Sequence, residues 1–222
     1  MKTSTPVREL QEAMEFHRDP EKAAQMTRYM KNKFEFLGIN QPVRKDLSKP
    51  FIQASKSFDM AEILQQAAEL WKLPEREYQY VAMELLYAGR KKWNTEAEKF
   101  FLALIRDKPW WDTVDFIAAK LIGGCLQKKK EQRIMKKWVA SDNIWENRTA
   151  LLFQLFYKEK TDSEFLFWAI NQLKTNKEFF IQKAIGWSLR QYHRVAPEKV
   201  EAFVEASGIT GLAKKEALKH AG

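Results

Sequence analysis

An internal repeat of 34 residues extends over residues 73–206. Met83, Ile117, Leu151 and Ile185 are apolar and each lies 34 positions after the one before it. Two further rows keep the same spacing and are apolar in all four copies: Ala82, Phe116, Ala150 and Ala184, and Tyr87, Leu121, Leu155 and Leu189. A repeat of this length is typical of stacked helix pairs, because one pair cannot bury its apolar face alone. The repeat therefore predicts an all-α chain.

The starts of the repeated helices also fall in register, at Leu73, Asp107, Ser141 and Thr175, and the last three residue types are good helix caps. A helix with a weaker sequence signal is predicted before each, such as residues 96–105 and 165–173. The tetratricopeptide signature of fixed Trp, Gly and Tyr positions is absent, so a HEAT-like repeat fits better. We expect a right-handed superhelical solenoid of HEAT-like antiparallel helix pairs with a concave basic face.

The flanking segments are predicted to belong to the same stack, so that residues 1–222 form one domain. Apolar spacing predicts N-terminal helices within residues 6–71, including one over residues 20–36 that Asp19 caps and Gly38 ends. Residues 196–206 and 210–221 fall out of register and are predicted to cap the stack. Only 8 Gly and 7 Pro leave few turn signals, which disfavours a multi-stranded β architecture.

Charge points to a polyanionic partner. The chain has 38 Lys and Arg against 29 Asp and Glu, a net charge of +9, and clustered cations bind phosphates by releasing counterions. The basic residues divide evenly between the halves, so folding must assemble any basic surface. A basic protein whose charges are evenly solvated is the alternative.

Several classes of protein are disfavoured. Cys125 is the only cysteine, which excludes an internal disulfide and a cysteine-rich zinc site, and its apolar neighbours predict a buried side chain. His17, His193 and His220 lack metal-ligand spacing, so we expect no metal and no cofactor. No apolar run approaches 18 residues. We therefore predict a cytoplasmic monomer that does not enter a membrane.

Asp115 is the unusual residue of the repeat. Its carboxylate follows Trp111 by one helical turn, precedes apolar residues, and has no neutralising residue nearby in sequence. Its equivalents in the other copies are Val81, Thr149 and Lys183, so the repeat itself does not require an acid. Arg148 lies in the adjoining row, which predicts that it neighbours Asp115 on the next helix, about 10 Å away between axes. Trp187 follows Lys183 by one turn on the helix after that.

Each of these residues has a purely structural alternative. Trp111 shares its row with Glu77, Trp145 and Phe179, so an aromatic residue there could serve packing alone. Trp187 shares its row with Leu85, Ala119 and Phe153, and it could also serve packing alone. Asp115 could form a structural salt bridge with Arg148, and Arg148 could be an ordinary surface arginine.

Five stretches carry a resemblance that covers nearly the whole chain: residues 24–32, 70–79, 110–115, 140–148 and 177–190. They resemble the AlkD family of HEAT-like DNA glycosylases, which remove alkylated bases. The most specific stretch is the last, which contains Ala184-Ile185-Gly186-Trp187. The resemblance implies that Trp111, Asp115 and Trp187 form the catalytic cleft.

The resemblance also implies contacts with double-stranded DNA. Arg148 would contact DNA beside the lesion, and Tyr29 would lie near the modified base. Lys183 and Arg190 are predicted to join them on the basic face. The implied reaction is hydrolysis of the N-glycosidic bond of 3-methyladenine or 7-methylguanine for base excision repair, without strand cleavage and without a base-flipping pocket.

The chemistry expected at Asp115 follows from the charge of such a base. Alkylation makes the base cationic, so its glycosidic bond is already weakened and needs no protonation. A carboxylate in a partly desolvated cleft would stabilise the oxocarbenium character that develops on the sugar. The alternatives left open are a non-catalytic helical repeat that binds nucleic-acid shape and a protein-interaction scaffold.

Overall fold

The computed structural model describes residues 4–129 and 132–219. Among these residues, regular structure is helical, and the only strand-like feature is an isolated bridge between Glu35 and Glu75. The all-α prediction is confirmed. The chain forms two compact units, residues 1–97 and 98–222, which are described separately below. The superhelical arrangement, its basic face and the single-domain organisation stay predictions.

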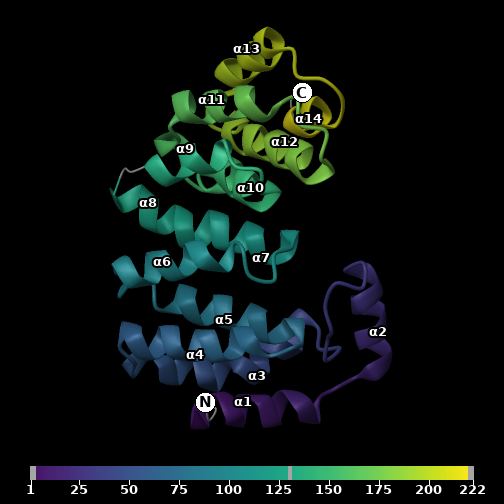
Figure 1. Cartoon of the computed structure of the whole chain (residues 1–222), viewed down its shortest axis with the longest axis vertical. Coiled ribbons are helices and arrows are strands. Elements are labelled where there is room, and N and C mark those ends of the chain that lie inside the picture. The colour runs from purple at the N-terminus through teal and green to yellow at the C-terminus, as the bar shows by residue number, and fades with distance from the viewer. Residues whose placement is uncertain (1–3, 130–131, 220–222) are drawn as a thin grey trace. The chain divides into compact units, whose positions relative to one another are not determined.

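The first unit contains five α-helices: α1 (Thr5–Phe16), α2 (Pro20–Tyr29), α3 (Gln41–Ala54), α4 (Met60–Lys72) and α5 (Arg76–Ala88). A 3₁₀ turn over Ser55–Ser57 follows α3. Helix α5 packs against α3 and α4, and α1 packs against the same two helices (Figure 1). Their buried faces form the core of the unit. Helix α2 differs from these four, because none of its residues is buried.

The predicted helix over residues 20–36 is partly correct. Asp19 caps α2 as expected, accepting a hydrogen bond of 3.0 Å from the Lys22 N–H. The helix ends at Tyr29, however, because Lys31 and Asn32 have φ angles of +58° and +56°, in the left-handed region that an α-helix cannot continue through. Gly38 therefore does not end this helix.

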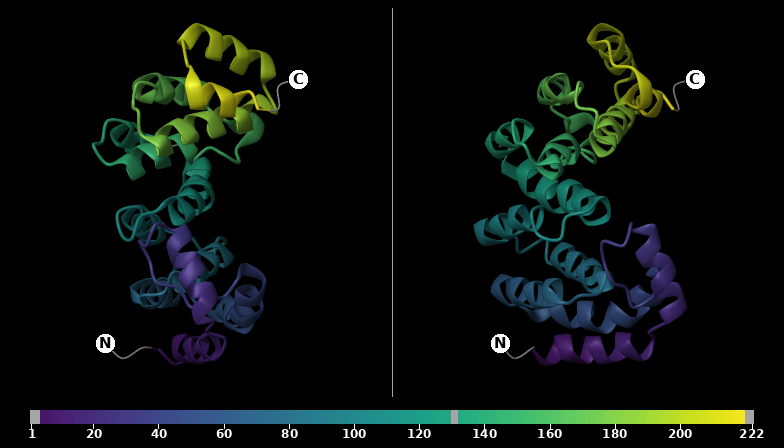
Figure 2. Two further views of the ribbon diagram at one scale, coloured as in Figure 1. Left: turned by 90° about the vertical axis from the view of Figure 1, so that its right-hand side faces the viewer. Right: turned by 45° about the vertical axis from the view of Figure 1, so that its right-hand side comes forward.

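The second unit continues the series with α7 (Trp111–Phe116), α8 (Gly123–Lys129), α9 (Arg133–Val139), α10 (Ile144–Leu152), α11 (Ser163–Leu173), α12 (Phe179–His193), α13 (Pro197–Ser207) and α14 (Gly211–Ala217). A π-helical segment, η2 (Ile117–Ile122), joins α7 to α8, and α6 (Thr95–Leu104) crosses the boundary between the units. Helix α10 contacts both α7 and α12, so these three helices lie in sequence order, and α12 also packs on α14 (Figure 2).

The repeat is visible in the helices, although its predicted starts are three or four residues early. The second helices of the pairs begin at Arg76, Trp111, Ile144 and Phe179, which are 35, 33 and 35 residues apart. Asp107, Ser141 and Thr175 are therefore not their caps. The preceding residues are instead Glu75, Trp110, Asn143 and Glu178.

Side-chain amides explain three of these late starts. Gln79 donates to the carbonyls of Trp71 and Leu73, at the end of the preceding helix. Asn147 and Gln182 do the same, with acceptors at Trp138, Val139 and Ser141 for Asn147 and at Lys174 and Asn176 for Gln182. These bonds satisfy the carbonyls at the end of the first helix that have no partner within that helix. The linking residues can therefore stay non-helical, and the second helix begins only after these residues.

Burial of the repeated rows supports the predicted core, except at Phe116, which is half-buried, and at Tyr87. Met83, Ile117, Leu151 and Ile185 are all at most 3 % exposed. Tyr87 departs from the prediction and is 37 % exposed, because it stands one residue before the end of α5. Its ring instead contacts Trp93 and the Arg90 guanidinium. Cys125 is buried as predicted, and burial raises the pKa of its thiol to about 11.

Candidate catalytic site

Asp115 and Arg148 form a two-bond ion pair between α7 and α10. Arg148 Nε donates to Asp115 Oδ1 at 2.7 Å, and Nη2 donates to Oδ2 at 2.8 Å. The predicted neighbourhood of these residues is therefore confirmed. Arg148 is only 4 % exposed, so it is not an ordinary surface arginine. The geometry matches the planar guanidinium to both carboxylate oxygens, which fixes the orientation of Asp115.

Arg148 also reaches the third helix of the series. Its Nη1 donates to the main-chain carbonyl of Phe180, in the first turn of α12. One guanidinium thus joins α7, α10 and α12. Because Trp187 stands two turns further along α12, the same contact helps to fix the helix that carries this predicted site residue.

The electrostatics of Asp115 are set by two opposing effects. Burial raises the pKa of its carboxyl above the ordinary value, while the hydrogen bonds and charge of Arg148 act in the opposite direction. Asp112, one turn earlier, raises the pKa further by like-charge repulsion. The side chain still keeps 15 % of its surface accessible. Asp115 is therefore a largely desolvated acid whose side chain keeps a small accessible surface.

The two predicted site tryptophans are both half-buried. Trp111 is the first residue of α7, one turn before Asp115, and Trp187 lies in the middle of α12. Each leaves part of its surface accessible, which distinguishes both from fully buried repeat positions such as Ile117. This exposure is compatible with contact to a ligand as well as with packing.

An aromatic cluster beside Arg148 was not singled out from the sequence. The rings of Trp110, Trp145 and Phe180 lie 5.2–5.5 Å apart between centroids, at distances typical of favourable aromatic pairs. The Phe180 ring also lies 5.8 Å from the Arg148 guanidinium carbon. Part of the signal was available, because Trp145 occupies the same repeat row as Trp111. The place of Trp110 in this cluster follows from the start of α7 at Trp111, which the sequence did not predict.

Lys183 and Arg190, the predicted DNA-binding cations of α12, share one anion. Glu216 of α14 accepts from Lys183 Nζ at 2.8 Å and from Arg190 Nη1 at 2.9 Å. The Lys183 hydrogen bond lowers the pKa of Glu216, so this carboxylate is ionised at neutral pH. Glu216 lies outside the repeat, and no sequence pattern singles it out. It leaves the three-residue cluster with one net positive charge.

Tyr29 lies in the first unit, at the C-terminal end of α2, and is 72 % exposed. Arg28, Lys31 and Lys33 are exposed around it. This short segment therefore presents one aromatic ring and three cations to solvent. Such a combination suits a phosphate backbone with bases beside it.

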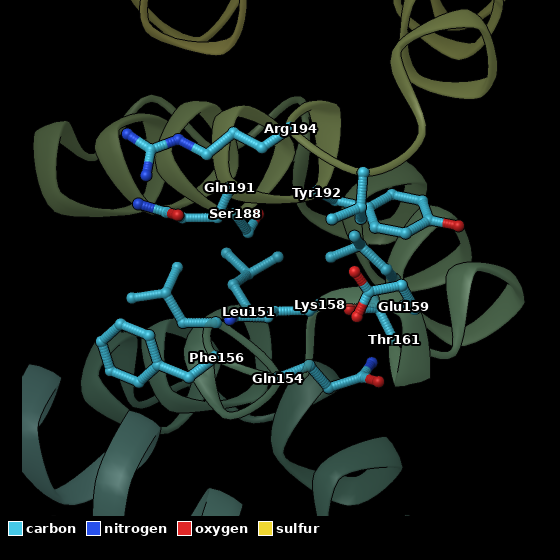
Figure 3. A pocket seen from close by; sticks show the side chains of 13 residues that line it. Leu151, Gln154, Phe156, Lys158, Glu159, Thr161, Ser188, Gln191, Tyr192 and Arg194 are labelled. Carbon is cyan, nitrogen blue, oxygen red and sulfur yellow. The ribbon is translucent and has the colours of Figure 1, made fainter.

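A pocket of about 240 Å³ lies elsewhere in the second unit, between the C-terminal ends of α10 and α12 (Figure 3). Its lining includes Gln154, Phe156, Ser188 and Arg194 but none of the predicted site residues. Within residues 4–129 and 132–219, no group of His, Cys, Asp and Glu side chains could hold a metal ion. No helix in the described part of the chain has the length and hydropathy needed to cross a bilayer.

Two comparisons with known proteins found a match over most of the chain. The family profile described as "DNA alkylation repair enzyme" matches residues 10–221. A solved structure described as a predicted DNA alkylation repair enzyme from Enterococcus faecalis is similar, with a TM-score of 0.86 and 38 % sequence identity. The similarity covers 91 % of this chain and 96 % of that one. No curated protein matches the sequence.

Proposed function

Because the chain belongs to the DNA alkylation repair enzyme family, we propose that it is a monofunctional DNA glycosylase acting on cationic alkylated purines in duplex DNA. The substrates are 3-methyladenine and 7-methylguanine. The observation that carries the proposal is the desolvated carboxylate of Asp115, held in one orientation by Arg148 on the neighbouring helix.

The proposed reaction is hydrolysis. The bond between C1′ of the deoxyribose and the base nitrogen breaks, and its electron pair leaves with the base, which becomes neutral. The sugar acquires oxocarbenium character, which the negative charge of Asp115 stabilises. Water then adds to C1′, and Asp115 accepts its proton before passing it to solvent. No lysine replaces water as the nucleophile, so the DNA strand is left uncut.

The surrounding residues have supporting roles in this proposal. Arg148 orients Asp115 through both of its oxygens, and the predicted DNA contact of Arg148 beside the lesion would add to that role. Trp111 and Trp187 would hold the sugar and backbone with their ring faces, whose quadrupoles also favour a cation. The lesion would be recognised without insertion of the base into a protein pocket, as the family resemblance implies.

DNA binding is proposed to rest on separate cationic groups. Lys183 and Arg190, both on α12, would contact DNA phosphates. Tyr29 would lie near the modified base. Such contacts give affinity that falls with salt and depends little on sequence. The excess of cations in the chain supports this part of the proposal.

The testing experiment compares wild type with Asp115→Asn on methylated duplex DNA. Base release by the variant is expected to fall by about a hundredfold or more, while its affinity for undamaged duplex is kept. Asp112→Asn is the matched control, because it removes the same charge one turn earlier and should change release by less than about threefold. Equal rates for Asp115→Asn and wild type would refute the role of Asp115.

One observation favours a second candidate function. Both oxygens of Asp115 are bound by Arg148, as a purely structural salt bridge would require. A non-catalytic module that binds DNA shape would keep this pair and the cations. It predicts salt-dependent binding of duplex by the wild-type protein with no release of methylated bases above the spontaneous rate.

A further inference from the structure

The position of α2 depends on the segment that follows it. No residue of Pro20–Tyr29 is buried, so this helix does not share in the core of the first unit. The following segment is different, because Phe36, Leu37 and Ile39 are at most 4 % exposed. The structural question is therefore what holds residues 36–39 in place.

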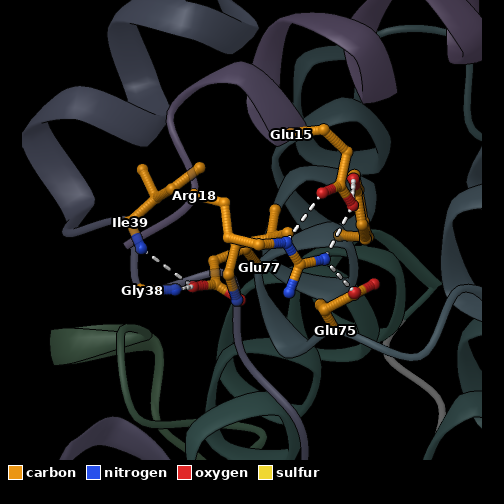
Figure 4. Close-up of polar contacts among 8 residues, drawn as sticks. Glu15, Arg18, Gly38, Ile39, Glu75 and Glu77 are labelled. Carbon is orange, nitrogen blue, oxygen red and sulfur yellow. Dashed lines mark hydrogen bonds and ion pairs between the residues drawn. The ribbon is translucent and has the colours of Figure 1, made fainter. Parts of the chain in front are cut away.

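Glu77 of α5 holds this segment through its main chain. Its Oε1 accepts from the N–H groups of Gly38 and Ile39 at 2.9 and 3.1 Å, and its Oε2 accepts from Leu37 at 3.0 Å (Figure 4). The side chain is fully buried. Burial raises the pKa of Glu77, while the backbone hydrogen bonds lower it. Three consecutive donors around one carboxylate form a defined anchor for the chain.

Gly38 connects the anchored segment to the first turn of α2 by direct backbone contact. A Cβ atom on Gly38 would lie 2.1 Å from the carbonyl oxygen of Asp19 and 2.8 Å from the nitrogen of Ala23. The two segments therefore touch through their backbones. Gly38 also has a φ of +87°, which favours glycine. The Asp19 N–H donates to the Leu37 carbonyl at 2.8 Å, which adds a second link.

Neighbouring residues reinforce the same junction. Arg18, just before α2, pairs with Glu75 at 2.5 Å and with Glu15 at 2.7 Å (Figure 4). The Arg76 N–H donates to the carbonyl of Glu35 at 2.8 Å. Both α2 flanks are thus tied to the start of α5, and Glu77 makes the only fully buried charged contact among the bonds named here.

The internal repeat argues that an acid at this position serves the segment rather than the core. The equivalents of Glu77 in the other copies are Trp111, Trp145 and Phe179, all aromatic. Of these three only Trp145 is buried, at 8 % exposure, while Phe179 is 58 % exposed, so the repeat does not require a buried acid in this row. A buried carboxylate is costly unless its oxygens are hydrogen-bonded, and here the donors come from residues 37–39.

We infer that Glu77 is a positioning residue for DNA binding: by anchoring residues 37–39 it sets the place of α2 and of the exposed Arg28 and Tyr29. This inference rests on the proposed function for the contact of Tyr29 with DNA. The anchoring itself does not depend on catalysis, so it can be measured without base release.

The first measurement is amide hydrogen exchange in Glu77→Gln and in Glu84→Gln. The glutamine keeps the shape of Glu77 but turns an NH₂ donor toward backbone N–H groups. Protection over residues 19–39 is expected to fall by about tenfold, while α4 and α5 keep theirs. Glu84→Gln is the matched control on the same helix, because it breaks the pair with Arg44 and leaves residues 19–39 alone.

The second measurement is a double-mutant cycle on the Kd for undamaged duplex. If Glu77 acts through α2, Tyr29→Ala and Glu77→Gln each raise Kd. The Kd of the double variant is then no higher than that of the single variant with the higher Kd. Gly38→Ala gives an independent approach with Glu77 intact, and it should expose the same residues to exchange.

The outcomes separate the two hypotheses. Three outcomes would each overturn the positioning role. Amide exchange could rise as much in α4 and α5 as over residues 19–39, exchange over residues 19–39 could stay unchanged, or the effects of the two substitutions on Kd could be additive. Wild-type protein that binds duplex but frees no methylated base would refute the glycosylase, while the exchange and Kd results would still decide the role of Glu77.

Discussion

Arg148 contacts both carboxylate oxygens of Asp115 across the α7 and α10 interface, with Nε and Nη2 at 2.7 and 2.8 Å. The arginine also binds the main-chain carbonyl of Phe180 on α12. Asp115 is thereby oriented by a group that is itself fixed between helices. Orientation and stability are coupled here, so substitutions of the pair should affect both.

Arg148→Ala is expected to destabilise the protein by about 3–5 kcal/mol, because it leaves the carboxylate of Asp115 desolvated and without its cation. Arg148→Lys keeps a charge but cannot bind both oxygens in the same plane, so it should recover only part of this loss. Urea unfolding of the three proteins measures the difference. A loss below about 1 kcal/mol for Arg148→Ala would mean that water or another cation replaces the arginine.

The pH dependence of base release should report the protonation of Asp115. Burial raises the pKa of this carboxyl, so the neutral form persists to higher pH than for an exposed aspartate. Since only the carboxylate stabilises the developing cation, release should fall as pH drops through that raised pKa. The measurement is kcat/KM on methylated duplex between about pH 4 and 8, corrected for spontaneous depurination. The residual activity of Asp115→Asn should lack this acid limb.

The sequence predicted the pairing of Asp115 with Arg148 because repeated positions in consecutive units lie side by side. It did not predict the partners of Lys183 and Arg190. Glu216 lies in α14, which falls outside the repeat, so no row relates it to α12. The register of a repeat determines neighbours within the repeat, but it contains no information about how a non-repeating helix packs on it.

The errors at helix boundaries have a similar origin. Ser141 and Thr175 are suitable caps by residue type, yet Asn147 and Gln182 bind carbonyls at the end of the preceding helix and in the linker, and the next helix begins later. Glu77 illustrates the same limit. Its equivalents in the repeat, Trp111, Trp145 and Phe179, are aromatic and do not indicate a buried acid. Residues 37–39, distant in sequence, supply the donors that make this acid acceptable. Tertiary hydrogen bonds override local preference in both cases.

Glu216→Gln should strengthen binding to duplex DNA, because it removes the anion shared by Lys183 and Arg190. Affinity is expected to rise about threefold to tenfold at low salt, and the plot of log K against log salt should steepen by about one unit. Glu201→Gln is the charge-matched control, because Glu201 is 55 % exposed and pairs with His193 instead. Equal effects of the two variants would assign the gain to net charge rather than to the freed cations.

Gly186 lies where α12 packs against α14, immediately before Trp187. A Cβ atom there would be 2.4 Å from Glu216 Cβ and 2.7 Å from the Ala213 carbonyl oxygen, both fixed parts of α14. Gly186→Ala must therefore displace α14, at a cost of about 1–3 kcal/mol measured by urea unfolding. Gly89→Ala is the control, because its nearest contact is the flexible end of Ile63 at 2.9 Å, and it should cost less than about 1 kcal/mol.

Because the displaced helix carries Glu216, Gly186→Ala should also weaken the pairing of Glu216 with Lys183 and Arg190. The DNA affinity of Gly186→Ala should therefore change in the same direction as that of Glu216→Gln. An unfolding free energy equal to that of wild type would show that α14 adjusts to the methyl group without loss of packing.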